Sequence, residues 1–454
     1  MQRYVEVVQQ AQQLHAAGEL HKAADLYEHL LGSQPDDPLV LYLYGTLHSQ
    51  AKMYGSAMVM LRLAVESAPQ LTEAWYNLGV CYRMEGHTEQ ARDAYRKVLA
   101  AEPNNAECLA MMAGSWCNEG APEIALQWAD KALALTPDDP HARNHKALAL
   151  LEMGRWDEAW PYYSTRWQLP GISVAQRPYE APLWDGEPVR LLAIHGEQGV
   201  GDEIMFLSCL EQLRGRFENI VIECEPRLQK LLQRTFDCPT YGTHDELIAA
   251  HPDVDAYIPM GGLAAMTRAG PECCPGQPYL KPDPEKVSGY RDWLHEQGDG
   301  PYVGICWHGG TKGTHQTLRN PPMEWWKELT AKQGTFVSLQ YGSLGLDGAI
   351  ELGLPHLQSA IDDLDDFAAL TAALDVVISP CQTAVHFAGA LGTECWCLTP
   401  NKPAWRYQLK GETMPWYDSV KLYRQGKGDW RRAFNKVLHD YDHDLLRRAE
   451  SAAA

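Results

Sequence analysis

The amino-terminal third of the chain repeats one pattern of small, large and proline positions every 34 residues. Alanine recurs at one position of this pattern and proline at another, and both series keep the same step. The recurring residues are Ala23, Ala57, Ala91, Ala125 and Ala159, with Pro35, Pro69, Pro103 and Pro137. A fixed period of this length indicates stacked units that bury their apolar faces against their neighbours. We expect five pairs of antiparallel helices over residues 1–165.

One repeat is nearly complete and shows what each position does. Gly79 and Ala91 are small where the two helices of a pair press together, and Pro103 ends the second helix. The large side chains that fill the space between neighbouring helices are Trp75, Leu78, Tyr82 and Tyr95. The pattern resembles the tetratricopeptide repeat, whose superhelix offers a concave groove to a polypeptide. It therefore predicts a protein partner in the groove; the alternative is a rigid arm or a dimerisation surface.

After the repeats, short apolar runs alternate with segments of helical spacing. This alternation predicts parallel sheets with helices between the strands. We expect a linker at 166–188, a Rossmann-like half at 189–284 and a second one at 285–454, which ends in a helix. The fold class is then a helical solenoid followed by α/β domains. The predicted strands are 189–194, 220–224, 256–259, 302–307, 336–340, 376–379 and 395–398, with a glycine-rich loop at 261–262.

The turn after the first predicted strand is the stretch on which the rest of the site depends. Its sequence is HGEQGVGDEIMF, from His195 to Phe206. Gly199 and Gly201 let the backbone turn tightly and let a ligand come close. Asp202 follows in the first turn of a predicted helix, at the carboxyl end of the strand, where open α/β sheets bind ligands. The alternative is that Asp202 caps this helix.

Loops of the second half carry residue types that bind phosphate oxygens. Thr311 and Lys312 lie in a glycine-rich turn after a strand, and the polar stretch that follows runs to Arg319. Glycine, hydroxyl and cation together suit phosphate, and a plain polar loop is the alternative. Gln340 stands at the carboxyl end of the next strand.

A later polar turn leads from a strand into a helix and contains Cys381, Gln382 and Thr383. The free N–H groups and the dipole at the start of that helix could hold a diphosphate. Gln382 and Thr383 add side-chain donors. His386 lies one turn inside the helix, where a histidine is more often a packing or hydrogen-bonding residue than a catalyst.

Composition and charge exclude several classes of function. The formal net charge of -20 argues against nonspecific binding to nucleic acid or to an anionic membrane. No apolar run is long enough to cross a bilayer. The 12 cysteines include no C-x-x-C pair, so we expect no metal site, and free thiols fit a reducing cytoplasm. Asp363 and Asp365 match the metal-binding D-x-D of some sugar transferases, but an acidic run before a helix is expected to cap it.

Four segments resemble the heptosyltransferase-like family, in particular its bacterial branch with tetratricopeptide repeats at the front. They are GEQGVGD at 196–202, SLQ at 338–340, SPCQTAVHFAGALG at 379–392 and MPWY at 414–417. The resemblance implies the GT-B architecture, in which two Rossmann-like halves have facing pockets. It also implies inverting sugar transfer without a metal or another cofactor.

The resemblance assigns roles to individual residues. It makes Asp202 the general base, and it makes Arg319, with Thr311 and Lys312 nearby, the site that steadies the donor diphosphate. It also implies that three residues of the later turn and its helix bind the donor: Gln382, Thr383 and His386. One departure is Cys381, where many relatives carry an aspartate.

We therefore expect a cytoplasmic glycosyltransferase that moves a sugar from a nucleotide-sugar to a hydroxyl, on a protein acceptor presented by the repeats. A base that takes the hydroxyl proton is worth about two to four orders of magnitude in rate. Two alternatives stay open. Cys381 favours an inactive scaffold that holds a nucleotide and a partner, and a transferase acting on lipopolysaccharide would use the repeats for assembly.

Overall fold

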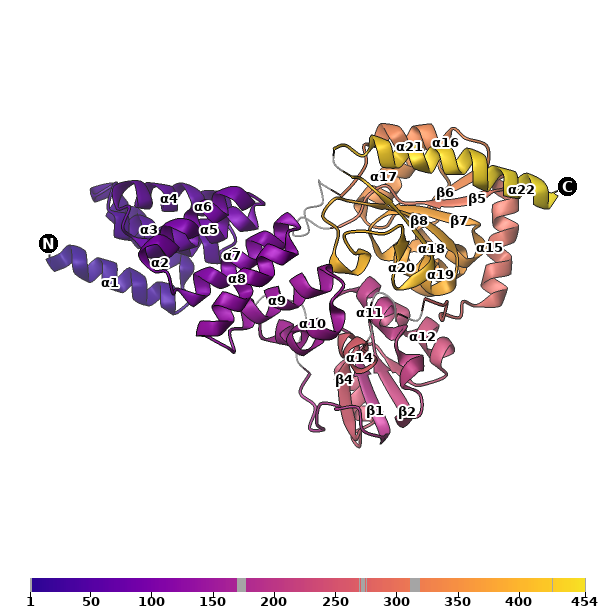
Figure 1. The fold of residues 1–454 in the computed structure, drawn as a ribbon, viewed down its shortest axis with the longest axis horizontal. Helices are drawn as coiled ribbons and strands as arrows, with labels where there is room; N and C mark the ends of the chain where they lie inside the picture. The colour runs from indigo at the N-terminus through magenta and orange to yellow at the C-terminus, as the bar shows by residue number, and fades with distance from the viewer. Residues whose placement is uncertain are drawn as a thin grey trace. The chain divides into compact units, whose positions relative to one another are not determined.

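The computed structural model describes residues 2–169, 177–268, 270, 274, 276–310, 319–426 and 428–453. The chain divides into two compact units, Met1–Ala149 and Leu150–Ala454. The first unit is built of helices, and the second contains two sheets with helices around them (Figure 1).

The helices of the first unit pack in successive pairs. They are α1 (Gln2–Ala16), α2 (Leu20–Ser33), α3 (Pro38–Gln50), α4 (Tyr54–Ser67), α5 (Thr72–Met84), α6 (Thr88–Ala101), α7 (Ala106–Glu119), α8 (Pro122–Leu135) and α9 (Pro140–Glu152). The helices α2, α4, α6 and α8 each end two residues before the recurring proline. The predicted helical repeats and their proline-marked ends are therefore confirmed.

The small positions of the repeat have the packing role that the sequence predicts. A Cβ atom on Gly79 of α5 would lie 2.4 Å from the ring of Tyr95 on α6. Tyr95 and Ala91 are fully buried. The same relation recurs in the preceding pair, where a Cβ on Gly45 would lie 2.7 Å from Leu61. Glycine is thus required because the paired helices touch there.

The boundary between the two units falls within α9, earlier than residue 165. The next helix, α10 (Trp156–Tyr163), and the 3₁₀ turn η1 (Ser164–Gln168) belong to the second unit. The reason is aromatic packing, because the ring of Trp156 lies 5.3 Å from those of Trp405 and Trp416, measured between centroids. The helical segment at the end of the repeats is therefore part of the α/β unit.

The predicted linker is packed where the structure describes it. Trp184 is buried, and its backbone N–H donates to the carbonyl of Tyr257 over 2.8 Å. Leu183 forms a parallel bridge with the same Tyr257. These residues extend the edge of the first sheet beside β4.

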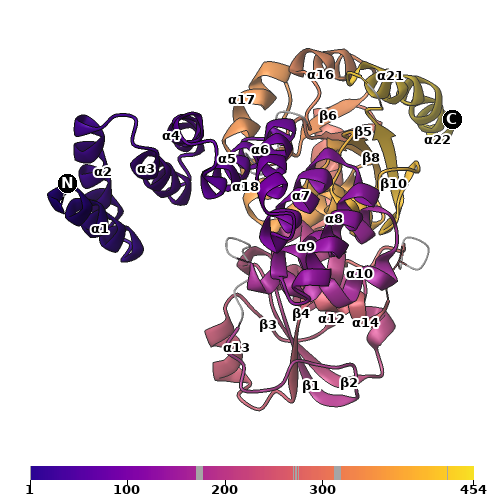
Figure 2. The ribbon, with the colours of Figure 1, turned by 60° about the vertical axis from the view of Figure 1, so that its left-hand side comes forward.

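The first sheet is parallel, with strand order β3-β2-β1-β4. Its strands are β1 (Val189–His195), β2 (Phe217–Glu223), β3 (Thr240–Tyr241) and β4 (Ala256–Pro259). Its helices and turns are α11 (Val200–Leu207), η2 (Leu210–Leu213), η3 (Pro226–Leu228), α12 (Gln229–Phe236), α13 (His244–Ala250) and α14 (Met260–Met266). Figure 2 shows α13 beside β3, at the edge of this sheet.

The predicted glycine-rich loop at Gly261 and Gly262 is wrong, because both residues lie inside α14. A Cβ atom on Gly261 would lie 2.3 Å from the carboxylate of Glu197, and one on Gly262 would lie 2.8 Å from Ile258. The glycines therefore allow close packing of a helix instead of a turn.

The second sheet has the order β6-β5-β7-β8-β10-β9 and is parallel except for the edge strand β9. Its strands are β5 (Tyr302–Ile305), β6 (Thr335–Ser338), β7 (Val376–Pro380), β8 (Glu394–Thr399), β9 (Thr413–Met414) and β10 (Tyr417–Arg424). Its helices are α15 (Pro284–Gln297), α16 (Met323–Thr330), α17 (Ser343–Leu352), α18 (Gln358–Asp362), α19 (Leu364–Ala373), α20 (Thr383–Leu391), α21 (Arg431–Asp440) and α22 (Leu446–Ala453), with a π-helical turn at Tyr441–Leu445. Side chains of α16, α17 and α21 share one core with the sheet, and α20 packs on β7, β8 and β10.

Two features of this sheet differ from the prediction. β5 ends at Ile305, because the N–H groups of Trp307 and His308 both donate to the side-chain oxygen of Gln340, over 3.1 and 2.9 Å. A side chain thus replaces the strand ladder at that point. The strand β10 was not predicted.

Candidate functional site

The amino-terminal ends of two helices, α11 beside the first sheet and α20 beside the second, pack against each other within the second unit. α11 follows β1 and α20 follows β7, so both begin at the carboxyl ends of central strands. A Cβ atom on Gly201 would lie 2.9 Å from the ring of His386. Gly201 is therefore the residue that lets the two helices approach, whereas a Cβ on Gly199 would touch only Asp202, at 3.9 Å.

Asp202 stands in the first turn of α11, as the sequence predicts, and forms an ion pair with Arg406. Arg406 belongs to the 3₁₀ turn η6 (Trp405–Tyr407), which follows β8 in the second sheet. The cap position of α11 is Gly199, and the Asp202 carboxylate accepts a hydrogen bond from the Arg406 guanidinium. The carboxylate of one half is thus bound by a cation of the other half.

The surroundings of Asp202 change the pKa of its carboxyl group. Burial raises the pKa of Asp202, and the positive charge of Arg406 opposes that shift. The side chains of Asp202 and Arg406 keep 20% and 18% of their surface exposed. A carboxylate with a raised pKa takes a proton more readily than an ordinary aspartate, which suits a general base.

A second cation lies near Arg406 without a carboxylate of its own. Burial lowers the pKa of Arg319, and its charged or titratable neighbours are Cys381, Tyr407 and Arg406. Among the described residues, no carboxylate pairs with Arg319. Two guanidinium groups thus lie near one another, and only that of Arg406 pairs with a described carboxylate, Asp202. This local positive charge suits an anionic ligand.

The turn before α20 is buried and closely packed. Gln382 is the cap residue of α20, and its amide donates to the Ser379 hydroxyl over 3.0 Å. The side-chain oxygen of Gln382 is buried and has no partner among the described residues. A Cβ atom on Gly309 would lie 2.6 Å from the Cys381 carbonyl, so the loop after β5 presses on this turn. Thr383 begins the helix, as the sequence predicts.

Cys381 contacts another thiol. Its Sγ lies 3.7 Å from the Sγ of Cys397 on β8. Burial alone would raise the pKa of the Cys381 thiol, but the hydrogen bond with Cys397 and the charge of Arg319 outweigh burial, so the pKa is lowered. A thiol with a lowered pKa thus stands at the position where the resemblance implies a carboxylate.

His386 is a packing residue in this structure. Its ring nitrogens lie 3.4 Å from the hydroxyls of Tyr407 and Tyr417. Burial lowers its pKa to about 3, so the ring is neutral at pH 7. Because it also contacts Gly201, His386 holds the two helix heads together.

The side chain of Gln340 binds backbone groups on both sides of its amide. Its side-chain oxygen accepts from the two N–H groups after β5, and its amide donates to the carbonyl of Tyr341. The predicted phosphate residues Thr311 and Lys312 lie outside the described residues.

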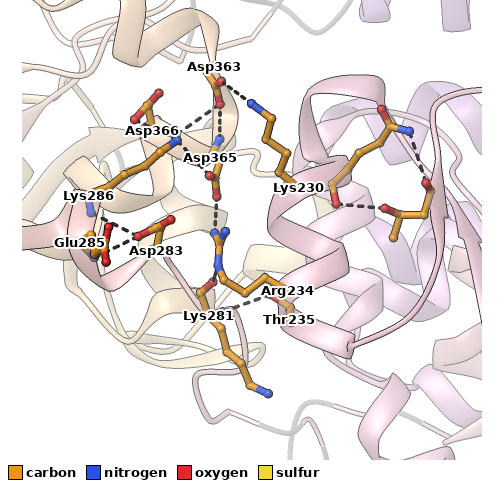
Figure 3. A network of polar contacts seen from close by, with 12 residues as sticks. Lys230, Arg234, Thr235, Lys281, Asp283, Glu285, Lys286, Asp363, Asp365 and Asp366 are labelled. Carbon is orange, nitrogen blue, oxygen red and sulfur yellow. Dashed lines mark hydrogen bonds and ion pairs between the residues drawn. The ribbon is translucent and has the colours of Figure 1, made fainter.

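The D-x-D segment is structural, as expected. The carboxylate of Asp363 accepts from the N–H groups of Asp365 and Asp366 and so caps α19. Asp365 is buried and bound by Arg234 of α12 and by Lys286 of α15, the latter over 3.0 Å (Figure 3). The hydrogen bonds from Arg234 and Lys286 outweigh burial and lower the pKa of Asp365. These carboxylates are committed to joining the two halves.

Sequence reasoning missed Arg406 as a site residue. It also missed the buried pair of Arg166 and Glu197, of which Glu197 lies in the loop before Asp202.

No group of three or more His, Cys, Asp or Glu among the described residues is arranged to hold a metal ion. Within the same residues, no helix has the length and apolar character needed to span a membrane.

Comparison with known proteins covers both units. The family model of the tetratricopeptide repeat matches residues 72–105. The protein FlbA of Caulobacter vibrioides is 28% identical over 448 residues, and the match covers 91% of this chain and 74% of FlbA. The type IV pilus assembly protein PilF of Pseudomonas aeruginosa is 33% identical over 88 residues, which covers 19% of this chain and 35% of PilF.

Among solved structures, a crystal structure of the MamA protein covers 37% of this chain and 92% of its own, with 20% identity and a TM-score of 0.33. The repeat match, the 34-residue period and the paired helices agree with one another. The chain is thus a homologue of FlbA and a tetratricopeptide-repeat protein, whose helical repeats precede an α/β region with two largely parallel sheets.

Proposed function

We propose that the α/β region is a glycosyltransferase of the GT-B architecture. It would move a sugar from a nucleotide-sugar to a hydroxyl, on a protein acceptor held by the repeats. The observation that carries this proposal is the ion pair between Asp202 of the first half and Arg406 of the second, with Arg319 near Arg406. Two largely parallel sheets with ligand-binding edges support the architecture.

Each residue has a defined task in this proposal. Asp202 takes the proton from the acceptor hydroxyl, whose oxygen then bonds to the anomeric carbon as the bond to the nucleotide diphosphate breaks. Arg319 and Arg406 neutralise the charge that develops on the departing diphosphate. The head of α20 adds N–H donors, and the unpartnered oxygen of Gln382 can accept from a hydroxyl of the donor. No metal is part of this proposal.

The ion pair links the two tasks. In the structure Arg406 binds the carboxylate of Asp202, which lowers the ability of that carboxylate to accept a proton. A diphosphate carries more negative charge than Asp202 and would draw the guanidinium toward itself. Donor binding would then free the base at the moment when it is needed.

The test is Asp202→Asn in the full chain. We expect transfer to fall by about two to four orders of magnitude, while nucleoside diphosphates still bind, because the amide keeps the shape and leaves both arginines in place. Candidate acceptors are examined by intact mass for an added glycan, with Asp253→Asn, an exposed carboxylate of the same half, as the control. Undiminished transfer in Asp202→Asn would refute the assignment of the base.

The capture of Asp202 by Arg406 also favours a second candidate, an inactive nucleotide-binding scaffold. In that case nucleoside diphosphates would raise the melting temperature by mass action, but no acceptor would gain mass. Transfer of any glycan by the purified chain excludes the scaffold. Transfer to lipopolysaccharide that survives intact when the repeats are removed would point to the glycan-directed alternative.

A further inference from the structure

A short helical segment, residues 156–168, holds the loop that carries Asp202. We call it the brace; it consists of α10 and η1 and precedes the first sheet. The sequence pattern made it the end of the last repeat, but its contacts within the second unit give it another task.

The first contact of the brace is a buried ion pair. The Glu197 side chain, in the loop between β1 and α11, has no exposed surface. Its carboxylate accepts hydrogen bonds from Nε of Arg166 over 2.9 Å, from Nη2 of Arg166 over 2.5 Å, and from the N–H of Gly261 over 2.5 Å. Arg166 in turn donates to the carbonyl of Tyr163 over 2.8 Å. The loop is thereby fixed to η1 by charge-assisted hydrogen bonds between buried side chains, where such bonds are strong.

The second contact holds a strained residue. Gln198 has φ of 69°, in the left-handed region that residues other than glycine rarely adopt. Its side-chain amide donates to the hydroxyl of Tyr163 over 3.1 Å. The next residue, Gly199, is the cap residue of α11, and Asp202 follows three positions later. Strain of this kind persists only where the surroundings hold it, so Tyr163 stabilises the conformation that presents Asp202.

The third contact reaches the partner of Asp202. The ring of Trp405, next to Arg406, lies 5.3, 6.1 and 6.0 Å from those of Trp156, Trp160 and Tyr163. The brace thus touches both the loop before Asp202 and the turn that carries Arg406. One rigid element therefore sets the distance between the two charged groups.

We propose that the brace is a positioning element of the site, and that Arg166 and Tyr163 are positioning residues for Asp202. Arg166 acts through Glu197, and Tyr163 acts through Gln198. The catalytic part of this proposal rests on the proposed function, and the structural part does not. A displacement of about 1 Å at a reacting group can lower the rate by about 100-fold.

The experiment compares Tyr163→Phe, Arg166→Gln and Arg166→Lys in the full chain. Tyr163→Phe removes only the oxygen that accepts from Gln198, and Arg166→Lys keeps the charge but loses the two-pronged geometry. The matched control is Arg190→Gln, which breaks an exposed ion pair with Asp253 in the same half. Two quantities are measured: hydrogen exchange of peptides spanning 196–207, and kcat and KM with a panel of nucleotide-sugars.

We expect faster exchange at 196–207 in Tyr163→Phe and Arg166→Gln, and an intermediate value in Arg166→Lys. In Tyr163→Phe, kcat should fall by about 10-fold with KM for the nucleotide-sugar unchanged, because the base acts only in the transition state. A merely structural role would change the melting temperature without separating kcat from KM. The control should match the wild type in both quantities.

Wild-type exchange at 196–207 in Tyr163→Phe and in Arg166→Gln would overturn the proposal. So would a fall in kcat that Arg190→Gln reproduces. If Arg166→Gln fails to fold, Tyr163→Phe decides alone, since it removes no charge. If the wild-type chain transfers no sugar from any donor, the proposed function fails, and the exchange data still decide whether the brace holds the loop.

Discussion

Replacing Glu203 with glutamine should make the protein more stable at neutral and alkaline pH. Glu203 follows Asp202 on α11 and is buried. Burial raises its pKa from 4.5 to about 7, and the hydrogen bond from the Glu225 N–H only partly opposes this. Glutamine has nearly the same shape and can accept the same hydrogen bond, but it carries no charge that must be buried.

The size of the effect follows from the two pKa values. Because the folded-state pKa of Glu203 is raised, its stabilising contribution is fully present below pH 4.5 and is lost as the pH rises to about 7. Each pH unit between the two values is worth about 1.4 kcal/mol, so the ionised carboxylate costs about 3 kcal/mol of unfolding free energy at pH 8. For a unit of this size, about 3 kcal/mol corresponds to roughly 5 °C in melting temperature.

Thermal denaturation of the full chain at pH 5, 6, 7 and 8 measures this effect. Glu203→Gln should raise the melting temperature of the α/β unit by about 5 °C at pH 8 and by much less at pH 5. The control is Glu225→Gln, since the hydrogen bond with Arg227 lowers the pKa of Glu225 and its loss should not stabilise the fold. An equal gain at pH 5 and pH 8, or no gain at pH 8, would contradict the reasoning.

Three further changes test other parts of the molecule. Arg319→Gln should weaken the binding of nucleoside diphosphates by about 10- to 100-fold, since a charge-assisted hydrogen bond is worth about 1.5–3 kcal/mol; calorimetric titration that gives an unchanged Kd removes Arg319 from the site. Asp365→Asn should lower the unfolding free energy in urea by about 3 kcal/mol, because its cationic partners stay behind. Because the pKa of Asp365 is lowered in the folded state, that loss should shrink as the pH falls below 3.8, and a loss that is independent of pH argues against a charge effect. Gly79→Ala should destabilise the repeats by about 1–3 kcal/mol through overlap with Tyr95, whereas Gly55→Ala, with nothing within 4 Å of the added carbon, should stabilise them slightly; melting curves that rank the two variants the other way contradict the packing argument.

The repeats could be predicted in detail because their packing is local. Gly79 and Tyr95 are near neighbours in sequence, and the same pair of positions recurs in the previous repeat as Gly45 and Leu61. In a repeated sequence the same pair of contacting positions occurs several times, so the contact can be recognised from the sequence. The sequence therefore supplied both the helices and the reason for their small residues.

Of the ion pair at the candidate site, only Asp202 could be predicted from the sequence. The glycines before Asp202 mark a turn at the end of a strand, and the structure places Asp202 there. Arg406 lies 204 residues away and has no glycine or spacing signal of its own, so its meeting with Asp202 depends on how the two sheets come together. Pairings of this kind are set by tertiary packing and leave no local trace.

Some local predictions failed because one residue type serves two purposes. Gly261 and Gly262 looked like a loop, but there glycine gives room for Glu197 and Ile258 against a helix. The apolar run after Tyr302 looked like a longer strand, but Gln340 binds its last two N–H groups and ends the ladder. Glu197 and Gln340, which contribute to these two outcomes, are remote in sequence from the residues that they contact.

The acidic head of α19 also limits how the α/β region can move. Asp365 is bound by Arg234 of the first half and by Lys286 of the second, and Arg234 also donates to the carbonyl of Lys281 in the segment that joins them. Rotation of one half against the other would break the bond between Arg234 and Asp365 unless the axis passes close to it. Any motion of one half against the other would therefore pivot at this point, with the largest displacements at the edges of the sheets that lie farthest from it.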